Sequence, residues 1–443
     1  MKKNYSYRHI WNVSYPIMIG LLAQNVINVT DTAFLGHVGE VELGASAMGG
    51  IYYVCFFTIF FGFSIGAQII ISRRNGENNH SAIGPVMMQG AIFLLALALL
   101  TIAFMFFFNG HILRFIISSE VILEATMTYI QWRMLCLVFG SLNVMFRAFF
   151  VGIIKTKVLS AHAIILAIAN VILDYLLIFG KFGFPEMGIK GAAIASIFAE
   201  LIAALFIIIY MLATVDLKKY GFTRIVSIDF GLLKNVLKIS IYTMFQFFIS
   251  MATYYLFFIV IERQGHQQLA IANIVRSIYI VMFIPLNALS GTTNALVSNI
   301  IGEGRVGEVM SLIRRIARML FLIMTASALL LCLFSKSIIA VYTNDIALIN
   351  GSVPAIYVVA IAVIIGSIGC SYFNGISGTG NTKAALMLEL GVLAIYTVQI
   401  YVMGVHFKLP VHLCMTGEIV YFAFLFAGSA LYLRFADWKK KKI

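Results

Sequence analysis

Twelve long stretches of mainly apolar residues follow one another along the chain, and each is long enough to cross a lipid bilayer as a helix. A span inside a bilayer must satisfy its own backbone hydrogen bonds, so helices are the default, and the ten-residue alternation of a β-barrel does not occur. The sequence therefore predicts an all-α integral membrane protein with twelve transmembrane helices. The expected spans lie near residues 10–36, 44–72, 84–108, 122–147, 158–180, 188–212, 236–262, 269–300, 312–334, 350–376, 384–407 and 411–434.

The placement of charge indicates which ends of the spans face the cytoplasm. Only 11% of the residues are charged, whereas a soluble domain carries roughly 25%. With a cytoplasmic N-terminus, 23 of the 31 Lys and Arg residues fall in inner tails and loops, 6 fall in outer loops, and Arg133 and Arg276 lie within spans. This bias predicts that both termini are cytoplasmic. It also assigns the net charge of +13 to the membrane surface, which argues against nucleic acid as a partner.

The cysteines argue against disulfide bonds and a zinc site, and the N-terminus argues against a cleaved signal peptide. Five cysteines are scattered through apolar segments without a CxxC pair, so neither a disulfide framework nor a zinc site is indicated. The N-terminus has basic residues before an apolar stretch, as a signal peptide does, but it lacks a small-residue cleavage site and contains Gln24, Asn25 and Asn28. We therefore interpret it as a retained first span.

The chain matches itself without gaps when it is displaced by 226 residues. Five glycines of the first half then fall on glycines of the second, including Gly140 on Gly366 and Gly191 on Gly417. Six spans per half make the halves parallel repeats, related by a pseudo-two-fold axis along the membrane normal, and transporters place a central site between such halves. Structural duplication without transport is the alternative. The expected organisation is an N-terminal six-helix bundle (1–212), a cytoplasmic linker (213–236) and a C-terminal six-helix bundle with a basic tail (237–443).

Two acids stand out because carboxylates inside a membrane are costly and commonly functional. Asp31 and Asp174 lie five and six residues before the outer ends of spans 1 and 5, hence at similar depth, and neither has an acidic counterpart in the second half. Gln24 and Asn28 share a helical face with Asp31, and Asn170 shares one with Asp174. Carboxylate and amide oxygens suit H⁺ or Na⁺, so we predict a cation site. The alternative is a structural hydrogen-bond cluster.

Other polar groups within the spans have weaker contexts. Glu200 either joins the same cavity or pairs with Arg133. Glu389 is expected to be a surface acid paired with Lys383, and no role is assigned to Glu418. His162 is either part of a proton relay or an ordinary interfacial histidine.

Several segments together resemble multidrug and toxic compound extrusion (MATE) transporters. They are the stretch from Asn28 to Gly36, NVTDTAFLG, with Leu43-Gly-Ala after it, and then NVILDYLLIFG from Asn170, GIKGAAIAS from Gly188 and GHQQLA from Gly265. No motif is strong alone, but their order and the 226-residue repeat make the resemblance specific. It covers nearly the whole chain.

The resemblance implies export of amphipathic organic cations from a bacterial cytoplasmic (inner) membrane by antiport with H⁺ or Na⁺. Family members use an acid at the position of Asp31, and the DinF-like branch also uses those of Asn170 and Asp174, with an amide and a hydroxyl that match Asn143 and Ser196. NorM-type members carry a glutamate in span 7, which here has none before Glu262, so the DinF-like branch is favoured. We expect a monomer without a cofactor that contacts lipid and small cations.

Three other functions fit the sequence less well. A lipid-linked saccharide flippase of the same superfamily is the main alternative, although it tends to need basic cavity residues for pyrophosphate and only Arg133 and Arg276 lie within spans. A major-facilitator porter would also have parallel halves, but this chain lacks the basic, Asp-containing loop that such porters usually carry after span 2. A membrane-embedded enzyme is disfavoured because no His-Glu-x-x-His, nucleophile elbow or phosphate loop is present.

Overall fold

The computed structural model describes residues 5–222 and 229–440, and these residues form helices without a β-strand. Eleven of the helices are long and apolar enough to cross a membrane, and the bent pair α4–α5 makes a twelfth span. The predicted all-α membrane fold with two six-helix halves is therefore confirmed. The part of the predicted linker at 223–228, which includes Arg224, lies outside the described residues.

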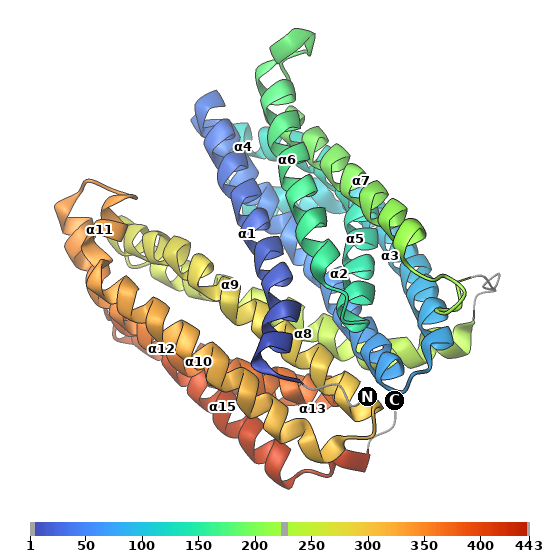
Figure 1. Ribbon diagram of the computed structural model, residues 1–443. Coiled ribbons are helices and arrows are strands. Elements are labelled where there is room, and N and C mark those ends of the chain that lie inside the picture. The colour runs from blue at the N-terminus through green and yellow to red at the C-terminus, as the bar shows by residue number, and fades with distance from the viewer. Residues whose placement is uncertain (1–4, 223–228, 441–443) are drawn as a thin grey trace. The chain divides into compact units, whose positions relative to one another are not determined.

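Contacts between helices divide the chain into two compact units, 19–244 and 1–18 with 245–443. The helices of the first-half repeat are α1 (Tyr7–Val38), α2 (Glu40–Gly76), α3 (Ile83–Ile116), α4 (Glu120–Arg133), α5 (Cys136–Gly152), α6 (Lys157–Phe179) and α7 (Gly188–Thr214). Those of the second are α8 (Phe230–Glu262), α9 (His266–Gly302), α10 (Val309–Leu333), α11 (Ser335–Ala340), α12 (Ile346–Gly378), α13 (Thr382–Ile400), α14 (Val411–Cys414) and α15 (Thr416–Phe435). Figure 1 shows their order by colour.

The unit boundaries differ from the predicted ones because α1 and α8 are each shared between both units. The division falls after Met18 in α1 and after Met244 in α8, positions that are 226 residues apart and therefore equivalent in the repeat. Within 1–18 and 245–443, the Ser14 hydroxyl bonds Thr292 at 2.9 Å. Within 19–244, the Thr243 hydroxyl donates to the Gly62 carbonyl oxygen at 2.7 Å. The N-terminal part of each repeat's first helix thus packs with the other repeat.

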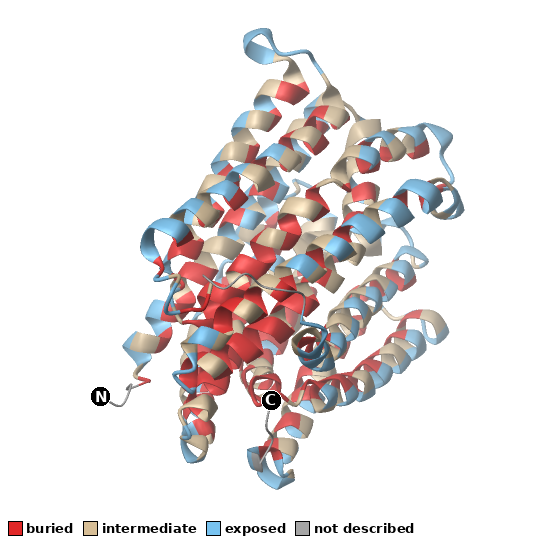
Figure 2. Cartoon of the chain, turned by 90° about the vertical axis from the view of Figure 1, so that its right-hand side faces the viewer, coloured by how far each residue is buried: buried red, intermediate tan, exposed pale blue. Residues whose placement is uncertain are grey.

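Each unit is organised around long helix-to-helix contacts. In 19–244, α6 packs along α7, and α2 packs against α4 and α5. In the other unit, α12 is central and contacts α9, α10 and α15, an arrangement that Figure 1 also shows for α10, α12 and α15. Buried residues, red in Figure 2, alternate with exposed ones along the helices.

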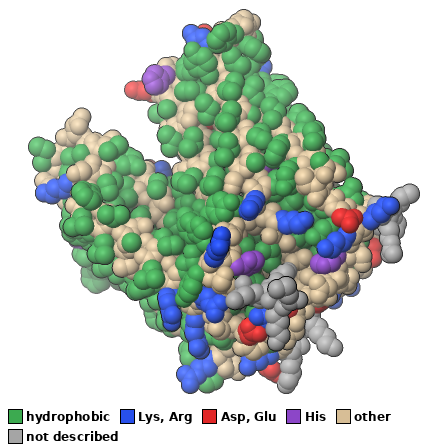
Figure 3. All heavy atoms as spheres, viewed as in Figure 1, with side chains coloured by type: hydrophobic (Ala, Val, Ile, Leu, Met, Phe, Trp, Pro, Cys, Tyr) green, Lys and Arg blue, Asp and Glu red, His purple; other side chains and the backbone are tan. Residues whose placement is uncertain are grey.

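Large apolar side chains remain exposed on the helices, as expected where lipid replaces water. Phe106 is 70% exposed and Leu330 is 58% exposed. Figure 3 shows hydrophobic side chains, in green, over most of the visible helix surface.

The fourth span is broken, whereas the sequence predicts a continuous helix over 122–147. Helices α4 and α5 meet at an angle of 51°. Around the break the Leu135 amide bonds the Trp132 carbonyl and the Leu137 amide bonds the Met134 carbonyl, so backbone bonds tighten from four-residue to three-residue spacing. Neither proline nor glycine marks this position. The break falls directly after Arg133, the last residue of α4.

Candidate functional site

Three of the predicted residues meet inside the unit 19–244, where α1 faces α6. Asn170 and Asp174 are buried on α6, and Asp31 is partly buried on α1. The surroundings fix the orientation of the Asn170 amide, because only with Nδ2 toward the acids are both of its polar atoms satisfied. Asn170 Nδ2 then donates to Asp31 Oδ1 at 3.0 Å and to Asp174 Oδ2 at 3.2 Å.

The two carboxyl groups also lie within hydrogen-bonding reach of each other. Ionised carboxylates only accept hydrogen bonds, so two of them cannot bond directly without a proton. The second oxygen of Asp174, Oδ1, is buried and has no donor among the described residues. The Asp31–Asn170–Asp174 cluster therefore provides carboxylate oxygens, held by the Asn170 amide, for one small cation or a shared proton.

Helix α6 is held in place for this role by its end and by its neighbour α7. It ends at Phe179 and is capped by Gly180, which has a left-handed φ of 62° and whose amide donates to the Leu176 carbonyl oxygen. Gly191 of α7 lies directly against the backbone at Leu177, one turn beyond Asp174. A Cβ at residue 191 would lie 2.5 Å from the Leu177 carbonyl oxygen, so glycine permits this close helix approach.

Arg133 supplies positive charge beside the cluster without forming an ion pair. Its guanidinium lies over the ring of Tyr53, 5.0 Å from the centroid, and its charge acts on both Asp31 and Asp174. Among the described residues no carboxylate lies within ion-pair distance of it, and its buried Nε has no acceptor. The break between α4 and α5 thus places a partly buried cation close to two acids but not in contact with them.

Glu200 belongs to a second hydrogen-bonded chain and is not ion-paired with Arg133. Asn143 Nδ2 donates to Glu200 Oε2 at 2.6 Å and to the Glu200 carbonyl oxygen at 3.0 Å. His162 Nε2 lies 3.1 Å from Asn143 Oδ1 and must be the donor there, because an amide oxygen only accepts. The chain His162–Asn143–Glu200 links α6, α5 and α7, and Arg133 faces Glu200 as well.

Four of the predicted site residues are not brought into contact with the acids. Gln24 and Asn28 are exposed on α1, so the shared helical face does not bring them to Asp31's partners on α6. The Ser196 hydroxyl bonds the Ala192 carbonyl of its own helix at 3.0 Å. Asn143 bonds Glu200 and His162.

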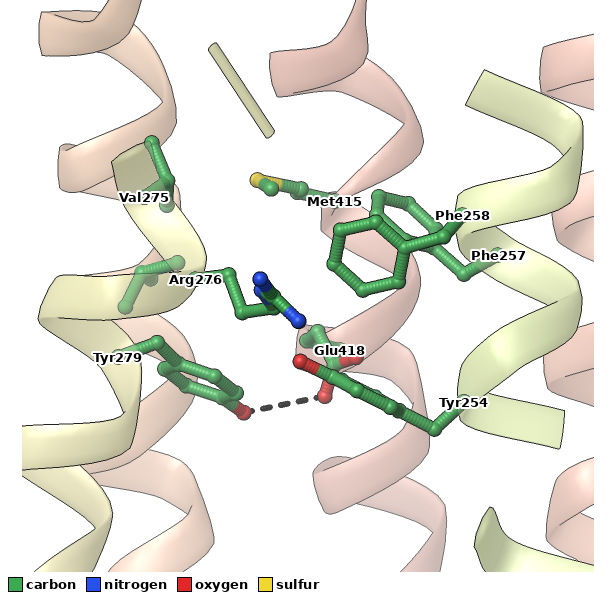
Figure 4. A pocket seen from close by; sticks show the side chains of 9 residues that line it. Tyr254, Phe257, Phe258, Val275, Arg276, Tyr279, Met415 and Glu418 are labelled. Atoms are coloured by element: carbon green, nitrogen blue, oxygen red, sulfur yellow. Dashed lines mark hydrogen bonds between the residues drawn. The ribbon is translucent and has the colours of Figure 1, made fainter. Parts of the chain in front are cut away.

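The second half has a different charged pocket, shown in Figure 4. Glu418 of α15 accepts from Tyr396 at 2.9 Å and from Tyr279 at 3.1 Å, so each carboxylate oxygen has a donor. The Arg276 guanidinium of α9 points into the same pocket and lies 5.3 Å from the Phe258 centroid. The cavity between these residues measures about 20 Å³, enough for about one water molecule.

The sequence interpretation missed the tyrosines of this pocket, although the repeat contained a signal for them. A displacement of 226 residues puts Tyr396 on Asn170, Tyr279 on Tyr53 and the pocket residue Phe257 on Asp31. Equivalent regions of the two halves therefore each carry a charged site. The acids of the two sites stand at positions that are not equivalent in the repeat.

Glu389 corrects another expectation, since it is not a surface acid. Its side chain is 4% exposed on α13, and it accepts hydrogen bonds from Ser250 at 2.6 Å and Tyr421 at 3.1 Å. Lys383 is exposed and forms no ion pair with it. Six residues of separation place the two side chains on different sides of the helix, since side chains four or three apart share a face.

A helical fold of twelve spans with paired acids buried between its helices defines this molecule as a multi-pass membrane protein of the secondary-transporter kind. The MatE family model matches residues 16–176 and 239–402, one segment in each half. The chain belongs to the MatE family.

Relatives and solved structures agree with this assignment. The chain is 27% identical over 347 residues to a probable multidrug resistance protein NorM of Photorhabdus laumondii, covering 75% of this chain and 73% of that protein. It is 22% identical over 442 residues to the protein of the same name from Thermotoga maritima, covering 98% and 94%. An outward-facing multidrug resistance MATE transporter of the MOP superfamily superimposes with a TM-score of 0.89 at 17% identity, covering 98% of this chain and 96% of that one.

Proposed function

We propose that this chain exports amphipathic organic cations by antiport with H⁺ or Na⁺, coupled through Asp31 and Asp174. The observation that carries the proposal is the contact of both carboxyls with Asn170, inside spans and away from any ion-pair partner among the described residues. The multidrug resistance names of its relatives support the substrate class.

The cluster can couple two ligands by competition. A proton or Na⁺ on the two acids removes negative charge from the site, whereas an organic cation is attracted by the unloaded, negative form. Each ligand biases the transporter only through its different affinity for the two states, and mutual exclusion is enough to give exchange. Arg133 lowers the net negative charge of the unloaded site without occupying it.

The DinF-like branch is part of this proposal. Helix α8, which matches the span that carries a glutamate in NorM-type members, has no acid before Glu262 at its end. The proposal therefore assigns coupling to the first half and treats the protein as a monomer of the bacterial inner membrane that needs no cofactor.

The direct test measures uptake of an organic cation into proteoliposomes with the pH gradient and the sodium gradient imposed separately. Exchange driven by either gradient supports antiport, and the gradient that drives it identifies the coupling ion. Flux that follows the drug gradient alone, with neither ion gradient accelerating it, would contradict coupling.

Topology is a separate expectation, with both termini in the cytoplasm. In a background without cysteine, Glu77→Cys should react with a membrane-impermeant maleimide only from the cytoplasmic side, and Glu186→Cys only from outside. Both positions are exposed in turns between helices, so reagent access is controlled by the membrane alone. Labelling of residue 77 in intact cells would reverse the orientation.

A further inference from the structure

The second half contains an apolar groove where α9, α10 and α11 meet. Its volume is about 420 Å³, which falls within the range of small-molecule sites, roughly 300–1,000 Å³. Of the nine described residues that line it, Ser327 and Tyr342 carry a hydroxyl and none carries a charge. The lining therefore suits an apolar ligand and offers no counter-charge to an ion.

The groove has a buried floor and an exposed rim. Ile278 and Leu331 form the floor and are 5% and 4% exposed, whereas the rim residues Val281, Leu330 and Phe334 are 52%, 58% and 56% exposed. An apolar surface that is exposed in this way marks a contact with a partner or with a membrane. Since the chain is a multi-pass membrane protein, hydrocarbon is the medium that such a rim contacts at the lowest cost.

The groove extends over a depth that fits one leaflet of a bilayer. Tyr342 lies in the turn between α11 and α12, is 48% exposed and has no hydroxyl partner among the described residues, as is typical of a tyrosine at the membrane interface. Ser327 lies six residues before Leu333, the end of α10, which corresponds to about 9 Å in a hydrocarbon core about 30 Å thick. A lipid tail runs inward from the interface in the same way.

Helix α9 is the wall between this groove and the Glu418 pocket. Ile278 and Val281 line the groove, whereas Arg276 and Tyr279 line the pocket. The Tyr279 hydroxyl donates to Glu418 at 3.1 Å. Whatever fills the groove therefore packs against the helix that positions two residues of the charged pocket.

Pro285 weakens α9 beside the groove. Proline has no amide hydrogen, so the carbonyl of Val281, four residues earlier, loses its helical donor. Val281 is itself a rim residue of the groove. An empty groove would leave its lining atoms without van der Waals contacts on one side. A ligand in the groove would therefore stabilise α9 where its own hydrogen bonds are incomplete.

We propose that one acyl chain of a membrane phospholipid occupies this groove and stabilises α9. The apolar lining binds the chain, and Tyr342 lies where the polar part of the lipid begins. An acyl chain fits better than an organic cation because none of the described lining residues is an acid. The proposal goes beyond the antiport, since lipid binding here does not depend on how transport is coupled.

The test uses a phosphatidylcholine that carries a photoreactive diazirine in one acyl chain, in nanodiscs that hold the purified full-length protein. Mass spectrometry after illumination identifies the labelled residues. We expect several-fold more label in the groove than at Phe106 and Phe107 of α3, which are 70% and 69% exposed and report on bulk lipid. Equal labelling of both surfaces would overturn the proposal, because the groove would then contact only exchanging bulk lipid.

Two matched pairs of variants separate occupancy of the groove from general contact with lipid. Leu330→Ser makes the rim polar, whereas Leu329→Ser makes the same change at a residue that is 59% exposed and outside the lining. Ser327→Phe fills the groove, whereas Ala326→Phe adds the same ring at an exposed position outside it. Groove labelling should fall several-fold in Leu330→Ser and Ser327→Phe and stay at the wild-type level in the two controls. Equal labelling within both pairs would overturn the proposal.

Thermal unfolding in detergent tests whether the lipid stabilises the protein. Phospholipid added to delipidated protein should raise the midpoint of the wild type and of Ala326→Phe, because a ligand that binds only the folded state stabilises it. Ser327→Phe should show a smaller rise, since its groove is already filled. If Ser327→Phe does not fold, Leu330→Ser and Leu329→Ser make the same comparison at an exposed position. A rise as large in the groove variant as in its control would overturn the proposal.

Discussion

Replacing Asp31 with Asn should abolish export driven by an ion gradient, and Asp174→Asn should abolish it or cause a severe defect. Either change removes a titratable carboxyl but keeps the side-chain size, so the site can no longer alternate between loaded and unloaded charge states. Asn170 still has one acid to bond in each variant, which should preserve folding. Ethidium efflux from cells that express each variant measures the effect, with membrane levels compared by immunoblot.

Glu186→Gln is a suitable control because it removes an acid from an exposed turn and should export at the wild-type rate. Near-normal efflux by both Asp31→Asn and Asp174→Asn, at equal protein levels, would show that these acids hold the helices together and do not couple transport.

Gly191→Ala should destabilise the protein, although alanine is the better helix former. The added Cβ would lie 2.5 Å from the Leu177 oxygen and 2.7 Å from its carbon, and backbone atoms cannot move aside as a side chain can. Forced overpacking of this kind costs typically about 1–3 kcal/mol, more than the roughly 1 kcal/mol of helix propensity gained. Thermal unfolding followed by size-exclusion chromatography should show a lower midpoint.

Gly50→Ala is the matched control, since it lies in a long helix and a Cβ there would meet no atom within 4 Å. It should leave the midpoint unchanged or raise it. Because α6 carries Asn170 and Asp174, the protein that survives in Gly191→Ala should also export more slowly per molecule. An unchanged midpoint for Gly191→Ala would show that α6 and α7 can separate at little cost.

The spans could be predicted because lipid imposes a length and a composition that a sequence displays directly. The meeting of Asp31, Asn170 and Asp174 could be predicted because matched depth and helical spacing are local properties. The break after Arg133 could not, since no residue there is a helix breaker and the bend is visible only in backbone bonds.

Contacts between side chains on different helices of the candidate site are harder to predict from the sequence. Gln24 and Asn28 share a helical face with Asp31. The sequence does not show which helix packs against that face, and in the structure Gln24 and Asn28 are exposed. Asn143 is polar and buried as expected, yet its contacts depend on how α5 meets α7, which no local pattern encodes. The spacing of Glu389 and Lys383 suggests a pair, but the partners of Glu389 come from helices far from it in the sequence.

The sharing of α1 between the two units has a consequence for the order of events during synthesis. The Tyr5 hydroxyl bonds Glu303 at 2.8 Å, across 298 residues of sequence, and Ser14 bonds Thr292 across 278. At about 5–20 residues per second, the first residues to leave the ribosome must wait roughly 15–60 s for the partners that will hold them. Residues 19–38 of the same helix find their neighbours in the first half and so much sooner. One helix is thus assembled in two stages, and its leading end is among the last parts of the protein to be secured.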